Sequence, residues 1–518
     1  MPSPLQTSVV LIGALACLVI GPGCVRKQYF QADARPDSAL AQPLSASADS
    51  VHGVTAGRQY ARHGRLYHAL IGRHYRSTWA APIAAPVLRL ATAQPGGLRP
   101  GKVGGGFNST SLNLSTPTGQ GYVLRTVDKD PIRATPKLLQ GTFLVNVLRD
   151  NVSSTNPYAS LVVPPFAQAL GVARAQPSLY YVRPDDAFFQ TDSLRLFRGQ
   201  LAYLEEKYAV APPSSGAGNP ASSTTAFTGV FASPNQRMDQ AALLRARLLD
   251  GWLGDWDRHA GQWNWLVRTQ PNAGFASILP LPKDRDMVFY RLDDGVLGWL
   301  IGHLAIRHWT TFRPRYPNIA HLMSNGKYLD ERSLNQLSRA DFEAAARAMQ
   351  QKLPDSLIGR AVRRMPAAAF ALEGPGIISA LQARRAALPA FAAAYYRQLA
   401  QHVLVGGTAQ AERFEIHRYR DSTVVTVRLV TAGSSDQPPQ FRRTFLPAET
   451  RTIQLEGLAG NDIFTIEQHG NQPVRLPALR LYGGPGTDEL PTNFLGRGAS
   501  FSQDSAPAKS AYDQPPKE

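Results

Sequence analysis

Two acid-rich turns in the middle of the chain constrain its fold more than any other feature. The first, Gly254-Asp-Trp-Asp-Arg-His-Ala-Gly-Gln-Trp-Asn-Trp265, follows a segment with helical apolar spacing. The second, Asp284-Arg-Asp-Met-Val-Phe289, follows the strand-like run 275–282. A helix, an acidic turn, a strand and a second acidic turn in this order predict an α+β domain whose rigid elements present carboxylates on consecutive turns.

Carboxylates and amides at these spacings suit phosphoryl transfer. That reaction uses one Asp to receive or orient the proton of the attacking hydroxyl, and Asp257 is the candidate base. An amide or acid shortly after it and a later Asp hold the metal ions on the donor phosphates. The candidate metal ligands are Gln262 or Asn264, Asp284 and, as a second carboxylate, Asp286. The alternative is structural: acidic turns that only cap helices and pair with Arg258 and Arg285. Gly-x-Ser-x-Gly and His-Glu-x-x-His motifs are absent, which disfavours a hydrolase.

The loop Asp257-Arg-His-Ala-Gly-Gln-Trp263 is similar to the catalytic loops of atypical kinases. These include secretory-pathway protein kinases, HipA-type toxin kinases and type II phosphatidylinositol 4-kinases. The turn 284–289 looks like the metal-binding turn of the same group. The resemblance implies an atypical kinase-like, two-lobed domain that uses ATP with Mg²⁺ or Mn²⁺. Arg258 and His259 would then stiffen the catalytic loop or bind phosphate.

Residues from about 57 to 490 also resemble an uncharacterised bacterial envelope family. The shared motifs are the triple glycine at 104–106, Leu-Arg-x-Val-Asp-Lys-Asp-Pro at 124–131, Glu-Glu at 205–206 and Gly-Asp-Trp-Asp-Arg-His at 254–259. Members of that family are often fused to an outer-membrane β-barrel. The resemblance therefore implies a barrel protein as a candidate partner of this chain.

The segment 96–127 is expected to carry the phosphate-binding part of the site. Alternating residues on both sides of a turn at 117–121 predict a β-hairpin. Gly104, Gly105 and Gly106 precede its first strand, where backbone N–H groups could approach phosphate oxygens; the alternative is a simple turn. Arg125 and Lys129 are alternative cations for the donor phosphates.

One departure from the kinase pattern favours a second interpretation. A kinase-like site needs an acid on the helix that follows the cation, and the predicted helix at 156–170 contains none. Asp150 precedes this helix and could reach back. The strand at 201–206 would be the hinge that binds a purine, or a plain strand ending in solvated acids. The alternative function is therefore a catalytically degenerate kinase-fold lipoprotein that acts as a binding or scaffolding partner of an outer-membrane barrel protein.

The N-terminus indicates export and lipid anchoring. The apolar run 9–20 is too short to span a bilayer and leads into Gly21-Pro-Gly-Cys24, which is typical of a lipoprotein cleavage site. The alternatives are an ordinary secretory signal or a short uncleaved anchor. Both cysteines of the chain, Cys17 and Cys24, lie in this leader, so the mature body has no disulfide or Cys metal site. We expect an outer-membrane lipoprotein of the cell envelope.

The net charge predicts the surroundings of the protein, and the changes of composition along the chain predict its segments. A net charge of +17 predicts an anionic neighbour such as the envelope surface, and no nucleic-acid-binding motif accompanies the spread basic residues. The predicted segments are a signal peptide (1–24), a flexible tether (25–56), an N-terminal β-rich lobe (57–205), a C-terminal helical lobe (206–405), a β-strand module (406–495) and a disordered tail (496–518).

The β-strand module contains two turns that resemble calcium-binding β-roll repeats. They are Gly457-Leu-Ala-Gly-Asn-Asp-Ile-Phe464 and Gly483-Gly-Pro-Gly-Thr-Asp-Glu-Leu490. The resemblance implies Ca²⁺ at Asp462 and Asp488, although tandem β-rolls share each ion between adjacent repeats and these two copies are separated. The alternative is a pair of ordinary turns, since Asn, Asp and Gly are common between strands.

Lipidation at Cys24 gives the first prediction. The acylated protein should need detergent for extraction from membranes, because the lipid and not a protein segment holds it there. Cys24→Ser should release the protein or stall its processing, as measured by membrane fractionation and by the mass of the mature chain. Unchanged membrane association and processing in the variant would rule out the lipoprotein.

Overall fold

The computed structural model describes residues 29–104, 111–137, 140–207, 220–269, 274–430, 438–470, 475–489 and 499–502. Cys24 and the rest of the predicted signal peptide lie outside the described residues, as do Gly105 and Gly106. The chain forms both helices and sheets, so the predicted α+β class is confirmed. In the described part of the chain, no helix is long and apolar enough to cross a membrane.

A five-stranded sheet lies in the N-terminal part of the chain. Its neighbouring strands are antiparallel, in the order β3 (Arg99–Gly104), β4 (Ser111–Ser115), β5 (Gly121–Thr126), β7 (Leu201–Glu206) and β6 (Ser178–Tyr181). The predicted hairpin is confirmed as β4–β5, with Ser111 opposite Arg125. Alternate side chains such as Leu112, Leu114 and Leu124 point to one face and form a core of their own.

Residues 29–56 correct the predicted flexible tether. β1 (Ser50–Val54) pairs with β2 (Ile83–Pro86), and the single-turn helix α2 (Asp37–Leu40) precedes it. The Tyr181 hydroxyl donates to Asp33 Oδ1 at 3.0 Å, and Gln31 Nε2 donates to Thr55 O at 2.8 Å. The small and polar residues of this segment are typical of a linker, but in the structure they form hydrogen bonds with residues far along the chain. Composition alone does not reveal such pairing.

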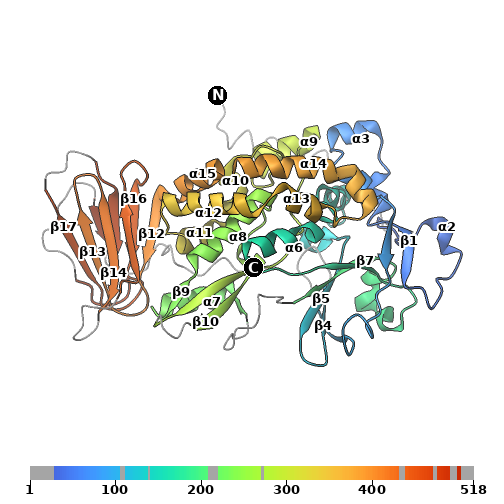
Figure 1. The fold of residues 1–518 in the computed structure, drawn as a ribbon, viewed down its shortest axis with the longest axis horizontal. Helices are drawn as coiled ribbons and strands as arrows, with labels where there is room; N and C mark the ends of the chain where they lie inside the picture. Colours follow the sequence, from blue (N-terminus) through green and yellow to red (C-terminus); the bar gives the residue numbers. More distant parts are fainter. Residues whose placement is uncertain are drawn as a thin grey trace.

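Helices pack beside this sheet and share the largest core, which continues into the N-terminal segment. In Figure 1, α12, α13, α14 and α15 run along one side of the molecule with α6 and α8 beneath them. The helices before the first acidic turn are α3 (Arg65–Leu70), α4 (Arg76–Trp79), α5 (Phe143–Asn151), α6 (Ala159–Leu170), α7 (Ser223–Ala232) and α8 (Gln240–Leu253). Those after it are α9 (Val296–Leu300), α10 (Ile319–Leu322), α11 (Lys327–Ser333), α12 (Arg339–Lys352), α13 (Asp355–Val362), α14 (Ala367–Ala386) and α15 (Leu388–Ala400).

Helix α8 is the rigid support of the first acidic turn. Its bounds confirm the helix over 240–253 that the spacing of Leu244, Leu248 and Trp252 predicts, with Asp239 as its N-cap. Asp239 caps its N-terminus by accepting a hydrogen bond from the Ala242 N–H, and Gly254 ends it with φ +74°. At the C-terminal end, the buried Arg384 of α14 donates to the carbonyl oxygens of Trp252 and Gly251. A cation that satisfies the last carbonyls fixes where α8 stops and the turn begins.

The sequence Ser338-Arg-Ala-Asp341 is typical of a capping box, and the Ala-rich amphipathic run 377–403 predicts one long helix. Ser338 and Asp341 form the predicted capping box at the start of α12. The single long helix predicted at 377–403 is instead the end of α14, all of α15 and the start of a strand. The break falls at Ala387, because Pro389 in the first turn of α15 lacks the N–H that a continuous helix would require.

A small sheet carries both acidic turns. Its strand order is β8 (Ala221–Ser222), β10 (Trp263–Thr269), β11 (Ala276–Pro282) and β9 (Gln236–Met238). The first acidic turn leads into β10, and β11 leads into the second. Because β10 and β11 are antiparallel, with Trp263 opposite Pro282, the two turns come to the same end of the hairpin.

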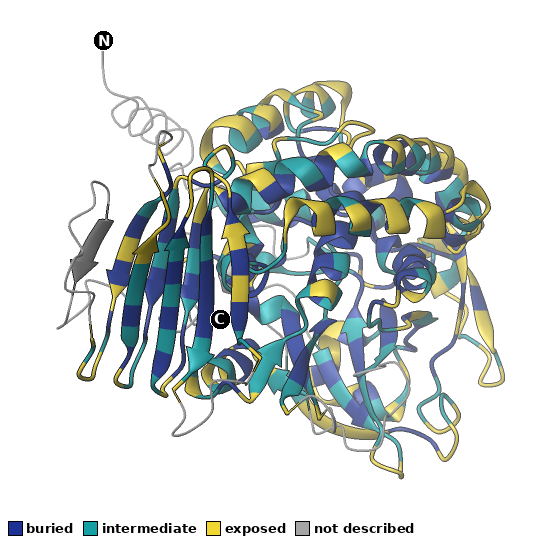
Figure 2. Ribbon diagram, turned by 60° about the vertical axis from the view of Figure 1, so that its left-hand side comes forward, coloured by how far each residue is buried: buried dark blue, intermediate teal, exposed yellow. Residues whose placement is uncertain are grey.

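The C-terminal module consists of two four-stranded sheets at one end of the molecule (Figure 1). One sheet is entirely parallel, in the order β12 (His402–Gly406), β16 (Thr452–Glu456), β18 (Ala478–Tyr482) and β19 (Ala499–Ser502). The other has the order β15 (Phe441–Phe445), β14 (Thr423–Leu429), β13 (Glu412–Arg418) and β17 (Ile463–Gln468). Figure 2 shows buried and exposed residues alternating along these strands. Strand β19 lies in the predicted disordered tail and corrects that prediction for residues 499–502.

Three stacked turns connect the strands of this module. Each begins with a glycine and ends with an acid, and the pairs are Gly407 with Glu412, Gly457 with Asp462 and Gly483 with Asp488. The Glu412 N–H donates to Asp462 Oδ1 at 2.8 Å, and the Asp462 N–H donates to Asp488 Oδ1 at 2.9 Å. A Cβ at Gly457 would lie 2.0 Å from Asp462 Oδ2, so the carboxylate packs directly over its own glycine. The predicted pair of turns is therefore part of a ladder of three.

The ladder leaves one oxygen of each Asp without a hydrogen-bond partner. Asp462 Oδ2 and Asp488 Oδ2 are both buried, and these are the atoms that Ca²⁺ would have to bind. Burial and the charges of Glu412 and Asp488 together raise the pKa of Asp462 to about 7, although the hydrogen bond from the Glu412 N–H opposes the rise. A carboxyl group in this position either holds a proton near neutral pH or needs a cation.

Asp462→Asn distinguishes these two states. The pKa of Asp462 is about 7 in the folded protein and about 4 in the unfolded chain. The folded state therefore binds more protons in this range, and wild-type stability should fall as the pH rises from about 4 to about 7. Without metal, Asp462→Asn should remove this slope and melt above the wild type at about pH 8. Circular dichroism melts in a chelator measure this, with the exposed Asp421→Asn as the control.

A lower melting temperature for Asp462→Asn than for the wild type under these conditions would contradict the protonation account. Addition of CaCl₂ tests the ion. A rise in the wild-type melting temperature that Asp462→Asn does not share is expected if the ladder binds Ca²⁺. Equal responses of the two proteins would contradict calcium at Asp462.

Candidate active site

A cleft between the five-stranded sheet and the second acidic turn collects most of the charged residues predicted for the site. The charged and amide side chains that line it come from five places in the chain. They are Arg125 on β5, Lys129 after it, Asn156 before α6, Glu205 on β7, and Asp284, Arg285 and Asp286 in the second acidic turn. The structure thus brings residues from the predicted N-terminal lobe and from the predicted C-terminal lobe into one cavity.

Each predicted cation faces a predicted metal ligand. Arg125 Nη1 lies 3.0 Å from Asp284 Oδ2, and Lys129 Nζ forms an ion pair with Asp286. Both side chains of each pair are largely shielded from solvent. The sequence left open which of Arg125 and Lys129 faces the phosphate position, and the structure lines the cleft with both.

The electrostatics of the cleft favour an ionised Asp284. Burial would raise the pKa of this carboxyl group, but the neighbouring Arg125, Lys129 and Arg258 hold it below its usual value. Burial lowers the pKa of Lys129, against the attraction of Asp284 and Asp257. A buried, charged carboxylate can bind a metal ion once the neighbouring cationic side chains form ion pairs with another anion.

Glu205 lines the cleft, although the sequence indicated it only as part of the Glu-Glu pair that ends the strand 201–206. Burial raises its pKa, while Arg125 and Lys129 counteract the rise. It lies on β7 opposite Val123, and Tyr203 lies opposite Arg125, so the two-residue period of the strands puts Glu205 and Arg125 on one face. The interpretation of 201–206 as a strand is confirmed, but Glu205 is not a solvated acid.

Asp150 does not reach the cleft. It accepts two hydrogen bonds from the buried Arg76, both at 2.6 Å, and a third from the Tyr67 hydroxyl at 2.8 Å. Burial would raise the pKa of Asp150, but hydrogen bonds from His63, Arg76 and Tyr67 and the charge of Arg76 keep it far below its usual value. The expectation that Asp150 reaches back to the predicted cation is therefore wrong. Within the five-stranded sheet, Glu205 is an acid that acts electrostatically on Arg125 and Lys129.

The candidate base Asp257 is held by a residue from a distant segment. Asn325 Nδ2, in the turn η9 (Ser324–Gly326), donates to Asp257 Oδ1 at 3.2 Å. His259 Nε2 lies 4.0 Å from the same oxygen, and His259 Nδ1 accepts the Gly261 N–H. Asp257 is close enough to the cleft to act electrostatically on Lys129. No local motif marks Asn325, so this contact could not be predicted from the sequence.

Arg258 ties the two acidic turns together. Its buried guanidinium donates from Nη1 to the carbonyl oxygens of Lys283 and Asp284 at 2.7 and 2.8 Å, and from Nη2 to Gln262 O at 3.0 Å. It also lies over the Trp263 ring, 4.8 Å from the ring centroid. These contacts fix the position of the Asp257 loop relative to Asp284.

A buried charge network lies behind Arg258. Arg285 forms ion pairs with Asp250 and, at 3.0 Å, with Asp255, and Arg258 lies 3.5 Å from Asp250. Burial would raise the pKa of Asp250, but the surrounding arginines lower it below its usual value. Burial raises the pKa of Asp255 to about 6. Removing one member would leave an uncompensated buried charge, which typically costs about 3–5 kcal/mol.

The remaining predicted residues have other positions. Gln262 accepts hydrogen bonds through its backbone oxygen, from Arg258 and from the Lys283 N–H at 2.9 Å. Asn264 is buried on β10, on the strand face opposite Trp263 and Trp265. Neither side chain is part of the cleft lining, so Asp284 and Asp286 are the predicted ligands that the structure brings together there.

Two backbone features accompany the site. Gly104, the described residue of the triple glycine, ends β3 opposite Ser111. Asp284 has φ +50°, a left-handed conformation that costs a non-glycine residue about 1–3 kcal/mol. The hydrogen bond from Arg258 to Asp284 O supports this conformation, which aims the carboxylate at Arg125.

No protein-family model, curated protein or solved structure matches the chain. The cleft is lined by three cations (Arg125, Lys129 and Arg285) and three acids (Glu205, Asp284 and Asp286). Arg258 joins the turn that carries Asp284 and Asp286 to the Asp257 loop.

Proposed function

We propose that the cleft binds a nucleoside triphosphate with Mg²⁺ or Mn²⁺ and transfers its terminal phosphoryl group, as an atypical kinase-like phosphotransferase. The observation that carries this proposal is the meeting of Arg125 and Lys129 with Asp284 and Asp286 in one cleft. Phosphoryl transfer depends on positioning and on charge neutralisation, which need cations for the phosphates and carboxylates for the metal.

Binding of the donor would exchange the partners in the cleft. The donor phosphates would take Arg125 and Lys129, and the metal would take Asp284 and Asp286. Each carboxylate would exchange a cationic side chain for the metal ion, and each cationic side chain would exchange a carboxylate for a phosphate. No carboxylate would therefore be left buried without a partner. Glu205, which faces both cations, would orient them in place of the acid that α6 lacks.

Asp257 is the proposed base for the acceptor hydroxyl. Its contact with Asn325 leaves a second carboxylate oxygen for the acceptor, and about a quarter of its side chain is exposed. Arg258 would keep this base at a fixed distance from the metal ligand Asp284. Such positioning is the main contribution that a protein makes to phosphoryl transfer.

The arrangement of the elements supports a two-lobed, kinase-like domain. The antiparallel sheet would be the smaller lobe, and β7 would lead from it towards the helical lobe that carries the acidic turns. The triple glycine at 104–106, of which Gly105 and Gly106 lie outside the described residues, would cover the phosphates from the β3–β4 connection.

We further propose that the protein works at the cell envelope as an outer-membrane lipoprotein. The leader ending at Cys24 and the net charge of +17, which suits an anionic envelope surface, support this location. A barrel protein of the outer membrane remains the proposed protein partner.

A second function, a catalytically inactive scaffold of the same fold, is favoured by one specific observation. Arg125 and Lys129 already neutralise Asp284 and Asp286, so the cleft is electrostatically complete without a ligand. A scaffold would keep these ion pairs closed, whereas a phosphotransferase must open them. Nucleotide binding distinguishes the two functions.

Asp284→Asn tests the metal site. The wild type should bind ATP with Mn²⁺ or Mg²⁺, and the variant should bind at least about tenfold more weakly because the bridging carboxylate is lost. Isothermal titration calorimetry measures both, with the exposed Asp192→Asn as the matched control. If the wild type binds no nucleotide with either ion, the scaffold is the remaining function.

Asp257→Asn separates catalysis from architecture. The variant keeps the size of the side chain and an acceptor for Asn325, so it should melt close to the wild type. Loss of a positioned base should lower the rate of phosphoryl transfer or autophosphorylation by about 10²–10⁴-fold. A variant that folds and keeps full activity would show that Asp257 is not the base, and one that unfolds would show a structural role.

A further inference from the structure

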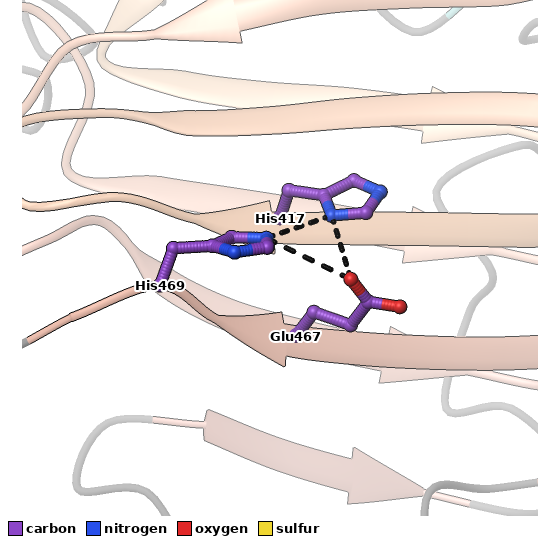
Figure 3. A group of neighbouring side chains, drawn as sticks. All are labelled: His417, Glu467 and His469. Carbon is purple, nitrogen blue, oxygen red and sulfur yellow. Dashed lines mark hydrogen bonds and ion pairs between the residues drawn. The ribbon is translucent and has the colours of Figure 1, made fainter.

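We propose that the C-terminal module binds a divalent transition-metal ion of the Zn²⁺ type through His417, Glu467 and His469. Figure 3 shows these three side chains turned towards a common point. They lie on β13 and on and just beyond β17, whereas Arg125, Glu205 and Asp284 of the cleft lie on β5, on β7 and in the second acidic turn. Figure 1 shows the C-terminal module at one end of the molecule, away from β5 and β7. The inference is therefore independent of the proposed phosphotransferase.

The strand register places all three residues on one surface. β13 and β17 are parallel neighbours, and His417 lies directly opposite Glu467. His469 follows two residues later, and its N–H donates to Arg418 O at 2.9 Å, so the pairing continues to this residue. Because successive side chains alternate between faces, Glu467 and His469 point to the same side of the sheet.

The separations of the candidate ligand atoms fit a tetrahedral ion. His417 Nδ1 lies 3.1 Å from His469 Nε2 and 3.2 Å from Glu467 Oε2, and His469 Nε2 lies 3.7 Å from the same oxygen. With Zn–N and Zn–O bonds of about 2.0–2.2 Å, two ligand atoms of a tetrahedral site are roughly 3.3–3.5 Å apart. The three atoms therefore already surround a position where one ion reaches all of them.

A single hydrogen bond does not satisfy all three atoms of this group. When the proton lies between the two ring nitrogens, the carboxylate oxygen of Glu467 receives no hydrogen bond from them. A cation satisfies all three lone pairs together. Two imidazoles and a carboxylate form a ligand set that Zn²⁺ accepts, and three protein ligands leave a fourth position for water or another group.

The surroundings hold the imidazoles in place. The Tyr419 ring stacks on His469, with centroids 4.7 Å apart and planes inclined by 13°. The His417 ring lies parallel to that of His469 within 23°. His417 is about a third exposed, and His469 and Glu467 are more exposed, so an ion can enter from solvent.

An ion at this position would join two strands that are far apart in the sequence. β17 is the edge strand of its sheet, where it pairs with β13 along its length and meets Glu489 in a single bridge at Ile463. Metal ligation from both strands would fasten this edge, and binding energy would then appear as stability of the module. Removal of the metal should therefore lower the melting temperature of the protein.

Co²⁺ is a suitable probe, because its visible absorption reports a four-coordinate site. Titration of the full chain should give this absorption, and Zn²⁺ should displace it. His417→Gln/His469→Gln should bind more than about 100-fold more weakly, since loss of even an outer-shell partner costs about 10–100-fold. His402→Gln, an exposed histidine on β12 in the same module, is the matched control and should bind as the wild type does.

A second readout excludes a general loss of folding. Without metal, the double variant should melt within a few degrees of the wild type, because both histidines are partly exposed. Zn²⁺ should raise the melting temperature of the wild type and of His402→Gln but not of the double variant. An unchanged Co²⁺ spectrum in the double variant, or a wild type that shows neither the absorption nor the Zn²⁺ shift, would overturn the proposal.

Discussion

The hydrogen bonds of Arg258 are the constraint on which the rest of the candidate site depends. The first acidic turn leaves α8 and the second leaves β11, and Arg258 binds the backbone of both. The buried pairs among Asp250, Asp255 and Arg285 hold its surroundings. A network of this kind is costly to build, because several charges must leave water together. Its location directly behind the Asp257 loop suggests a requirement for positioning and not only for stability.

The cleft depends on this rigid base because its other side comes from a separate sheet. Arg125 and Lys129 reach across from the five-stranded sheet to carboxylates that Arg258 has fixed. The two sides are joined by ion pairs that a nucleotide and a metal ion could replace group by group. In the proposed function, a preorganised set of carboxylates receives the metal while the opposing cations receive the phosphates.

Local patterns in the sequence predicted helices and strands. The residues that were missed or misjudged depend on contacts between segments far apart in the chain. The capping of α8 by Asp239 and the β4–β5 hairpin follow from residues close in sequence, and both are confirmed. Glu205 was missed because its face depends on the register between β5 and β7, which no single strand records. Asn325 was missed because its contact with Asp257 spans 68 residues. The segment 29–56 was misjudged because its composition hides buried partners such as Tyr181.

The central claim is that the Arg125–Asp284 and Lys129–Asp286 pairs give way to a metal–nucleotide complex. A crystal structure with Mn²⁺ and a non-hydrolysable ATP analogue tests it most directly, because the anomalous signal of manganese locates the ion. The account predicts manganese between Asp284 and Asp286, with Arg125 and Lys129 turned to the phosphates. Both ion pairs intact, with the ion or the nucleotide bound elsewhere on the protein, would contradict it.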